Sequence, residues 1–298
     1  MGVFILFIFV ASSVYMHYRG KVRHSFGRQL TSHTNLTAPY NVFTYLFSKV
    51  ANTPYIDKSQ FESARIFDEH WETIRDEAKA LHAAEKITKS DAVDDLAFNS
   101  FFRTGWGRFY LKWYDDFLPS ALEHCPKTIE LIKSMPDINA AMFASLPPGA
   151  KLVPHRDPFS GSLRYHLGLM TPNSEDCFIL VDGEKYHWKD GESVMFDETF
   201  IHRAINNTDE QRVILFCDIN RPLRYRWANW INKQMCNTVV KASSSKNIAG
   251  EKVGFLNHIF KHLYKLRSIG RSFKRWNRKI YYTTKYFLYF GIVYLIFF

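Results

Sequence analysis

The chain has 298 residues, of which 46% are hydrophobic and 16% aromatic, and its formal net charge is +10 at pH 7. This length allows one sizeable domain with appendages, and the aromatic content is high for a soluble protein. The four cysteines are scattered and form no C-x-x-C pair, which argues against a disulfide framework or a zinc site and fits a reducing compartment.

The N-terminal stretch is apolar and is followed by basic residues. Residues 2–18 contain only Ser12, Ser13 and His17 as polar positions, and arginines and lysines then recur from residue 19 to 28. A signal peptide has its charge before the apolar run, so the reversed order predicts an uncleaved membrane anchor over residues 1–18, just long enough to span. Residues 19–56 would form a juxtamembrane segment. Its aromatic part, 37–55, is either a helix packed on the domain or an amphipathic segment in the lipid interface.

Two stretches have the periodicity of helices. Apolar residues recur at spacings of three and four between Phe61 and Leu81, which predicts an amphipathic helix that ends before Lys89 and backs a sheet. A second, shorter helix is expected over 126–135, where Pro136 stops it.

The middle of the chain is typical of a β-protein. In Leu163–Met170 large apolar or aromatic side chains alternate with other residues, as in a strand with one buried face. Short β-rich runs follow at 177–181, 185–188, 193–196 and 212–219. Asp182-Gly183 and Asp190-Gly191 mark hairpin turns between these runs. The pattern predicts a mainly β domain over residues 57–240 with flanking helices, and its core is a jelly roll or a barrel. Of these two, we expect the jelly roll, a cupin-like double-stranded β-helix.

A candidate metal site lies in this β region. His155-x-Asp157 precedes the alternating strand, and His202 follows at the start of a later one. Two histidines and one carboxylate are the three facial ligands of non-haem Fe(II) oxygenases, which leaves coordination positions for a 2-oxo acid and O2. Arg212, ten residues after His202, supplies a fork for the far carboxylate of that acid.

These motifs together resemble the aspartyl/asparaginyl β-hydroxylase family. The resemblance covers roughly residues 100–222 and rests on four runs: His155-x-Asp157, Leu163-Arg-Tyr-His-Leu-Gly-Leu, Phe196-Asp-Glu-Thr-Phe-Ile-His202 and Gln211-Arg-Val-Ile-Leu-Phe. It implies a hydroxylase with Fe(II) as cofactor and 2-oxoglutarate and O2 as cosubstrates. Some relatives have glycine at the position of the carboxylate ligand and use two histidines alone. This chain has Asp157 at that position, so a complete triad is expected.

The resemblance also implies further cosubstrate contacts. Arg164 and His166 correspond to an Arg and a His that the family uses for 2-oxoglutarate, and Trp106 corresponds to the Trp of its Trp-x-x-Phe element. The family's serine before a Pro-Gly turn aligns with Ala144, and Ser145 is one position away. Because a one-residue slip moves a strand residue to the other face, Ser145 is a doubtful ligand.

Charged residues near the last two strands have two interpretations each. Asp197 and Glu198 either orient the His202 imidazole or belong to an ordinary loop. Arg221, Arg224 and Arg226 follow the last strand, and they either close the domain with salt bridges or bind a lipid head group.

The charge is segregated between the domain and the ends of the chain. Residues 57–240 contain 22 Lys and Arg against 28 Asp and Glu, which gives a net charge of −6. The rest of the chain therefore has a net charge of +16. The basic segment 241–279 leads into the apolar segment 280–298, which predicts a juxtamembrane belt and a second membrane segment rather than a nucleic-acid arm. This second segment either spans the membrane or is anchored in its interface. By the positive-inside rule, the domain faces the cytoplasm.

With both apolar ends included, the whole chain resembles family members that hydroxylate lipid A. This implies hydroxylation of a lipid A acyl chain at the cytoplasmic face of the bacterial inner membrane, with no nucleic-acid or protein partner. Two alternatives stay open: hydroxylation of a peptide Asp or Asn, and a non-catalytic metal-binding jelly-roll sensor. Arg212 favours an enzyme, because a structural metal needs no cosubstrate anchor.

Overall fold

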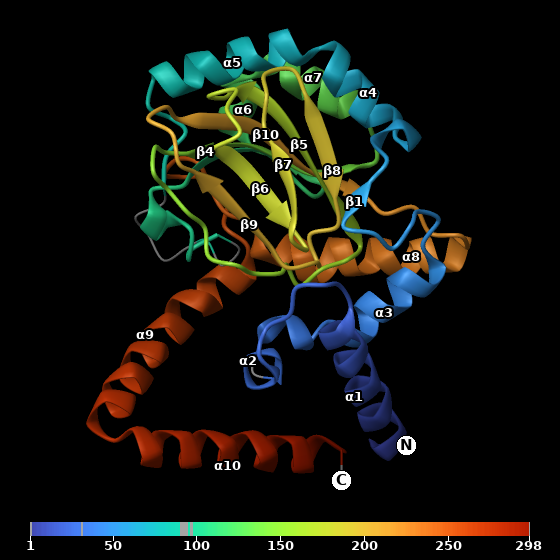
Figure 1. Cartoon of the computed structure of the whole chain (residues 1–298), viewed down its shortest axis with the longest axis vertical. Helices are drawn as coiled ribbons and strands as arrows, with labels where there is room; N and C mark the ends of the chain where they lie inside the picture. The colour runs from blue at the N-terminus through green and yellow to red at the C-terminus, as the bar shows by residue number, and fades with distance from the viewer. Residues whose placement is uncertain (1, 31, 90–94, 96–97, 298) are drawn as a thin grey trace.

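Two β-sheets form the centre of the protein, as the computed structural model shows (Figure 1). The structure describes residues 2–30, 32–89, 95 and 98–297. The larger sheet has the strand order β1-β8-β5-β10-β4-β2-β3, and the smaller has the order β7-β6-β9. The strands are β1 (Tyr55–Ile56), β2 (Gly107–Trp113), β3 (Asp116–Phe117), β4 (Ile138–Leu146), β5 (Ser162–Met170), β6 (Cys177–Val181), β7 (Glu184–His187), β8 (Ser193–Phe196), β9 (His202–Asn206) and β10 (Arg212–Asn220).

The two sheets make the predicted jelly roll. These strands pair antiparallel to one another, and the smaller sheet is widened by residues 151–155, which run along β9 through the Lys151–Ile205 and His155–His202 bridges. The β6–β7 hairpin turns at Asp182 and Gly183, whose positive φ angles of 52° and 88° are those of a tight hairpin turn. The strand predictions from residue 163 to residue 219 are therefore confirmed.

Helices cover the outer face of the larger sheet. These are α4 (Glu62–Glu69), α5 (Trp71–Ala83), α6 (Pro119–His124) and α7 (Pro126–Ser134). The apolar stripe predicted over 61–81 is buried, and Phe67 stacks on Tyr165 of β5 with 5.6 Å between ring centroids. The stripe belongs to two helices rather than one, because His70 leaves the helical conformation (φ −108°, ψ 18°).

The N- and C-terminal helices lie at the opposite end of the domain from α4 and α5 (Figure 1). They are α1 (Gly2–Tyr18), α2 (Phe26–Leu30), α3 (Ala38–Phe47), α8 (Arg226–Met235), α9 (Phe255–Trp276) and α10 (Arg278–Phe297). Short 3-10 turns occupy His33–Asn35, Lys58–Gln60, Phe102–Thr104 and Lys241–Ser243, and a π turn spans Cys236–Val240. The α3 helix packs on the domain through Tyr40, which stacks on Phe159, and buried Asn41.

The expectation of membrane-spanning helices at both ends is not supported. Within the part of the chain that the structure describes, no helix is long and apolar enough to cross a membrane. The α1 helix stops after 17 residues, and α10 contains Arg278, Lys279 and Lys285.

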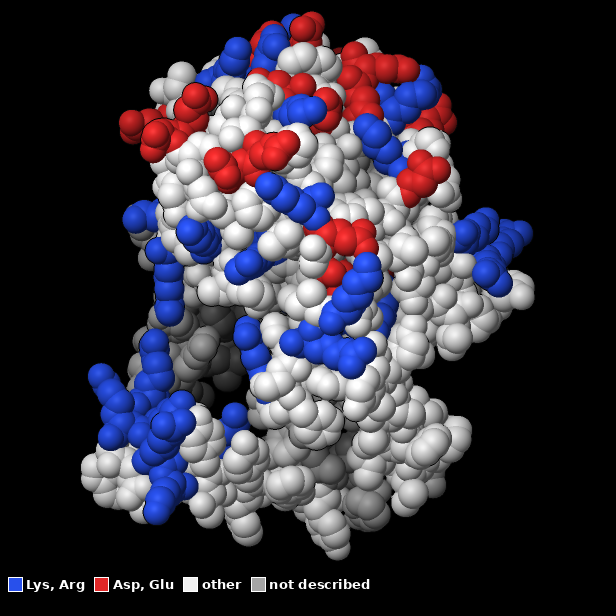
Figure 2. Space-filling view, in the orientation of Figure 1, with Lys and Arg blue, Asp and Glu red and all other residues white. Residues whose placement is uncertain are grey.

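The surface charge is unevenly distributed. Figure 2 shows acidic side chains gathered over α4 and α5, whereas the part of this face formed by α1, α9 and α10 shows basic and uncharged side chains. Many apolar side chains of α1 and α10 are exposed, including Phe4, Phe7, Phe287 and Phe290.

Candidate active site

The three predicted metal ligands come together. His155 and His202 face each other across a pair of backbone hydrogen bonds, His155 N to His202 O at 3.0 Å and His202 N to His155 O at 2.8 Å. One ligand atom of each histidine and one Asp157 carboxylate oxygen all lie within 4.8 Å of one another. Because β9 and the segment 151–155 are paired at this point, the fold itself brings the distant His202 to the His-x-Asp motif.

The histidine rings are oriented for metal binding. Nδ1 of His155 lies 2.8 Å from Val153 O, and Nδ1 of His202 lies 3.0 Å from Phe200 O. A carbonyl oxygen only accepts, so each Nδ1 carries the proton and each Nε2 keeps its lone pair for a metal. Burial, followed by the neighbouring His155, lowers the pKa of His202 to about 3, which keeps its imidazole neutral.

A cluster of carboxylates around Arg164 supports the third ligand. Nη2 of Arg164 donates to Asp157 Oδ2 at 3.1 Å and also to Glu198, and its Nε donates to Asp218 Oδ1 at 2.8 Å. The guanidinium stacks on Phe216 with Cζ 3.8 Å from the ring centroid. Because Asp157 Oδ2 is held by Arg164, Oδ1 faces His155 Nε2 at 3.8 Å, in the position of a single-oxygen ligand.

Arg212 lies at the other end of the same pocket, and it has a different environment. Its side chain is fully buried and stacks on Trp188, with Cζ 4.4 Å from the ring centroid. Among the residues that the structure describes, no carboxylate pairs with it, and its Nε has no hydrogen-bond partner. Burial lowers the pKa of Arg212 to about 10, which shows how poorly its charge is compensated by the protein itself.

His166 and Trp188 add further polar atoms without partners beside Arg212. Both ring nitrogens of His166 and Nε1 of Trp188 are buried and lack hydrogen-bond partners within the described chain. Burial, together with Arg164 and Arg212, lowers the pKa of His166 well below its usual range. Since buried polar groups are nearly always satisfied, these atoms mark a place where a polar ligand fits.

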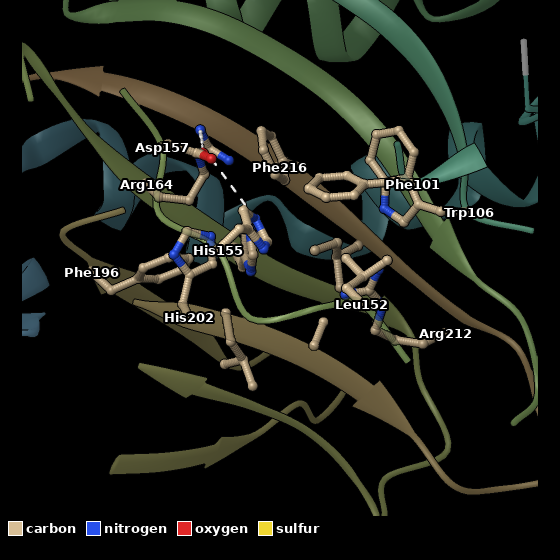
Figure 3. Close-up of a pocket in the computed structure, with 14 residues that line it drawn as sticks. Phe101, Trp106, Leu152, His155, Asp157, Arg164, Phe196, His202, Arg212 and Phe216 are labelled. Carbon is tan, nitrogen blue, oxygen red and sulfur yellow. Dashed lines mark hydrogen bonds and ion pairs between the residues drawn. The ribbon is translucent and has the colours of Figure 1, made fainter. Parts of the chain in front are cut away.

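Figure 3 shows that Arg164 and Arg212 lie on opposite sides of the two histidines. Both arginines, the triad and His166 line one pocket, whose remaining lining is apolar and consists of Phe101, Trp106, Leu152, Ile179, Phe196, Ala204, Ile214 and Phe216. The His155 and Asp157 side chains are 20% and 23% exposed, so the pocket opens to solvent at the metal end.

The residues present fit the cofactors that the sequence predicts. Two neutral imidazoles and one carboxylate are a donor set for Fe(II), and the uncompensated Arg212 guanidinium is a partner for a carboxylate. The unpartnered His166 and Trp188 atoms extend this polar patch. A dicarboxylic 2-oxo acid suits both ends of the pocket. Its 2-oxo acid group would bind a metal held by the triad, and its far carboxylate would pair with Arg212.

The remaining predicted cosubstrate contacts divide into two groups. Trp106 is buried, stacks on Phe98 at 4.9 Å and lines the pocket. Ser145 does not line it: Ser145 pairs with Val213, whereas Arg212 pairs with Leu146, so the side chains of Ser145 and Arg212 point to opposite faces of the sheet. The doubt about Ser145 from the sequence therefore has a geometric basis.

The charged residues around the site have separate roles in the structure. Glu198 pairs with Arg164, whereas Asp197 pairs with Arg221 and with Arg19, at 2.7 Å each. Arg221 is fully buried and closes the domain, which agrees with the first of its two interpretations. Arg224 donates to Ser48 O at 3.1 Å, and Arg224 and Arg226 are both exposed.

Three residues of the site were not singled out from the sequence. Asp218 and Phe216 share the pocket face of β10 with Arg212, and the period of two along a strand is the signal that points to them. Trp188 was expected only as part of a strand, and no sequence pattern links it to Arg212, since the contact joins the residue that follows β7 to the start of β10.

Comparison with known proteins agrees with this geometry. The family model described as aspartyl/asparaginyl β-hydroxylase matches residues 68–222, which is more than half of the chain. The chain belongs to the aspartyl/asparaginyl β-hydroxylase family. The matched range contains the metal triad, Arg164, His166 and Arg212, so the family resemblance seen in the sequence is confirmed.

Individual relatives point to two kinds of hydroxylase. The ornithine lipid ester-linked acyl 2-hydroxylase of Rhizobium tropici is 34% identical over 189 residues, which cover 62% of this chain and 67% of that protein. The human aspartate beta-hydroxylase domain-containing protein 2 is 27% identical over 206 residues, or 66% of this chain and 54% of that protein. The chain thus spans about half to two thirds of these relatives.

Among solved structures, a Pseudomonas putida prolyl-4-hydroxylase is similar over 52% of this chain and 87% of its own, with 14% identity and a TM-score of 0.34. At this TM-score the jelly-roll assignment rests on the strand order of the chain itself.

Proposed function

We propose that the chain is an Fe(II)- and 2-oxoglutarate-dependent hydroxylase that acts on an acyl chain of a membrane lipid, lipid A in particular. The observation that carries the reaction class is the position of Arg212. Arg212, a buried cation with no carboxylate partner in the described part of the chain, lies in the same pocket as a His-Asp-His triad. A cosubstrate that ligates a metal at one end and presents a carboxylate at the other accounts for both.

The residues of the pocket have distinct tasks in this reaction. His155, Asp157 and His202 would hold Fe(II), which together with 2-oxoglutarate activates O2 so that one oxygen atom enters a C–H bond and the other enters succinate, with release of CO2. Arg212 binds the far carboxylate, and Trp188 holds the guanidinium plane beneath it. Phe101 packs against His155 with 4.8 Å between ring centroids and Phe196 packs against His202 with 5.6 Å, so apolar side chains flank the metal end.

An acyl chain suits the substrate side of this pocket. The lining near the exposed edge of the triad is apolar, and the relative with 34% identity is named as an acyl 2-hydroxylase. The proposed attachment to a membrane has its own support: apolar side chains are exposed on α1 and α10, and basic residues of α9 lie beside them (Figure 2). Such a surface fits the interfacial layer of an anionic leaflet, here proposed as the cytoplasmic face of the bacterial inner membrane.

A second candidate is hydroxylation of a peptide Asp or Asn side chain with the same iron chemistry. The names of the human relatives favour it. The two candidates differ in what approaches the exposed side of His155 and Asp157: a hydrocarbon chain or a polar peptide.

The experiment that tests the proposal is mass spectrometry of total lipids from cells with and without the gene. A gain of one oxygen on a lipid A acyl chain, lost when His202→Ala replaces the natural chain, is the expected result. The same gain on an ornithine lipid would keep the reaction and change the lipid. Unchanged lipids together with a hydroxylated Asp- or Asn-containing peptide would replace this proposal by the second candidate.

A further inference from the structure

The last turns of α1 are part of the domain. Ser12, Ser13, Met16 and His17 are buried, whereas the first turns of the same helix expose Phe4 and Phe7. The helix ends at Tyr18, and Gly20 follows two residues later; its φ of +87° and its close approach to the Asp182 carboxylate leave no room for a side chain. Backbone N–H groups of Lys21 and Val22 then donate to that carboxylate at 2.8 Å each, which fixes the direction in which the chain leaves the helix.

Arg19, at the end of α1, is tied to the loop that precedes His202. Its Nη2 donates to Asp197 Oδ2 at 2.7 Å and its Nη1 donates to Thr199 Oγ1 at 2.8 Å. The guanidinium also lies over the Phe200 ring, with Cζ 3.6 Å from the centroid. Burial is the largest single influence on the pKa of Arg19 and lowers it, but the charge and hydrogen bond of Asp197, together with Tyr45 and Tyr15, raise this pKa overall.

The same loop contacts two metal ligands directly. Glu198 O accepts from Asp157 N at 2.9 Å, and Phe200 O accepts from His202 Nδ1 at 3.0 Å. A shift of this loop would therefore move a carboxylate ligand and change the ring orientation of an imidazole ligand together.

Arg156 makes a second connection between α1 and the triad. It stands between His155 and Asp157, and its Nη1 donates to Met16 O at 2.6 Å. Met16 is in the last turn of α1, where carbonyl groups have no partner within the helix, so Arg156 satisfies an acceptor that the helix leaves open. Both ligand-bearing segments are thus bonded to the same helix end.

We infer that Arg19 is a positioning residue of the metal centre, which it holds through the loop 197–200, and that the end of α1 is a structural part of that centre. The inference rests on the proposed role of His155, Asp157 and His202 as metal ligands. Arg19 touches neither metal nor substrate in this arrangement. It acts on Asp157 and His202 through backbone carbonyls of the loop.

The test is metal affinity in the full chain. Mn(II), as a stable substitute for Fe(II), is titrated into the wild type, Arg19→Met, Arg19→Lys and the matched control Arg23→Met, and the melting temperature without metal is recorded for each. Loss of groups that orient metal ligands weakens metal binding by about 10- to 100-fold, so Arg19→Met should raise the Kd for Mn(II) about tenfold or more. Arg19→Lys should recover part of the loss, and Arg23→Met, on an exposed neighbour, should change nothing.

The outcomes separate the inference from the proposed function. If the wild type binds no Mn(II), the metal site itself is wrong. If the wild type binds and Arg19→Met has a lower melting temperature but an unchanged Kd, Arg19 is only a stabilising residue and the inference is overturned. Arg156→Met covers the case in which Arg19→Met does not fold: it breaks the second connection, and a Kd equal to that of the wild type would equally contradict a role for α1.

Discussion

The two ends of the pocket differ in how their charges are compensated. On the pocket face of β10, Asp218 is paired with Arg164 at 2.8 Å, whereas Arg212, about 20 Å away along the strand, is buried with no carboxylate partner among the described residues. At the first end the protein supplies its own counter-charges, and at the second it does not. The difference indicates that Arg164 supports a ligand of the protein, Asp157, whereas Arg212 is built for a ligand from outside.

The largest expected effect is loss of the metal ligands. His155→Ala, Asp157→Ala and His202→Ala should each reduce turnover by about 1,000-fold or more, because a site with two of its three ligands no longer stabilises the charge that develops in the reaction. Circular dichroism should show an intact fold. His187→Ala, on β7 outside the pocket, is the matched control. Normal activity in any of the three variants would remove that residue from the triad.

Arg212→Met tests the end of the pocket whose charge has no counter-charge among the described residues. Loss of a buried partner for the cosubstrate carboxylate costs about 2–5 kcal/mol, so the KM for 2-oxoglutarate should rise by about 30-fold or more while the KM for the lipid changes less. Without 2-oxoglutarate, the variant should be as stable as the wild type or more stable, because an unpaired buried cation has been removed.

Thermal shift measurements check both parts of the Arg212 prediction. Added 2-oxoglutarate should raise the melting temperature of the wild type and of the control Arg203→Met, whose arginine is exposed on β9, but not that of Arg212→Met. An equal shift in all three proteins would mean that Arg212 is not the carboxylate anchor.

Arg164→Met tests the end of the pocket where the protein supplies its own carboxylate partners. Removing the cation takes the Arg164 counter-charge from Asp157, Glu198 and Asp218, and breaking such a buried pair costs about 3–5 kcal/mol of stability. Metal affinity should fall together with stability, and adding Asp218→Asn should restore part of the stability. If the variant instead raised only the KM for 2-oxoglutarate, Arg164 would be the cosubstrate ligand that the family resemblance implies.

The smallest effect is a pH dependence of the metal-free protein. The pKa of His202 is lowered to about 3, and that of His166 is lowered well below its usual range, in each case chiefly by burial. The unfolded chain therefore binds more protons below pH about 6.5, so each histidine lowers the unfolding free energy by about 1.4 kcal/mol per pH unit as the pH falls from there toward the folded-state pKa. Above pH about 6.5 the effect should vanish.

Urea unfolding at pH 7.5, 6 and 5 checks this sign. His166→Phe keeps an aromatic ring in the aromatic pocket and should reduce the pH slope by the contribution of one histidine. Identical slopes for the variant and the wild type would show that His166 is not held neutral in the folded protein.

Much of the fold could be predicted from the sequence because its signals are local. Alternation in β5 and the Asp182-Gly183 turn are short-range patterns, and the structure contains them as predicted. The break at His70 had no such signal, since the apolar stripe continues through it. For the ends of the chain, hydrophobicity predicted membrane-spanning helices, but the buried last turns of α1 follow from contacts with residues more than a hundred positions away.

The site shows the same division. That His155, Asp157 and His202 lie together could be predicted from the sequence, as could the presence of Arg212 in the same pocket, because the proposed chemistry requires those residue types. The partners of Arg164 and the contact of Trp188 with Arg212 could not be predicted from the sequence, because they depend on which parts of the folded chain face each other. Arg19 and Arg156 were visible in the sequence only as basic residues, and only the folded chain shows that Arg19 bonds to the loop before His202 and that Arg156 bonds to the end of α1.

The most direct test of the central claim is a stoichiometry measured on purified full-length protein. Fe(II), 2-oxoglutarate labelled at its carboxylate, 18O2 and vesicles that contain lipid A are combined, and succinate and lipid are analysed in the same sample. The account predicts one 18O atom on a lipid acyl chain and one in succinate for each molecule of CO2 released, and loss of all three in Asp157→Ala. Hydroxylated lipid formed at the full rate without 2-oxoglutarate, or with no 18O in succinate, would contradict it.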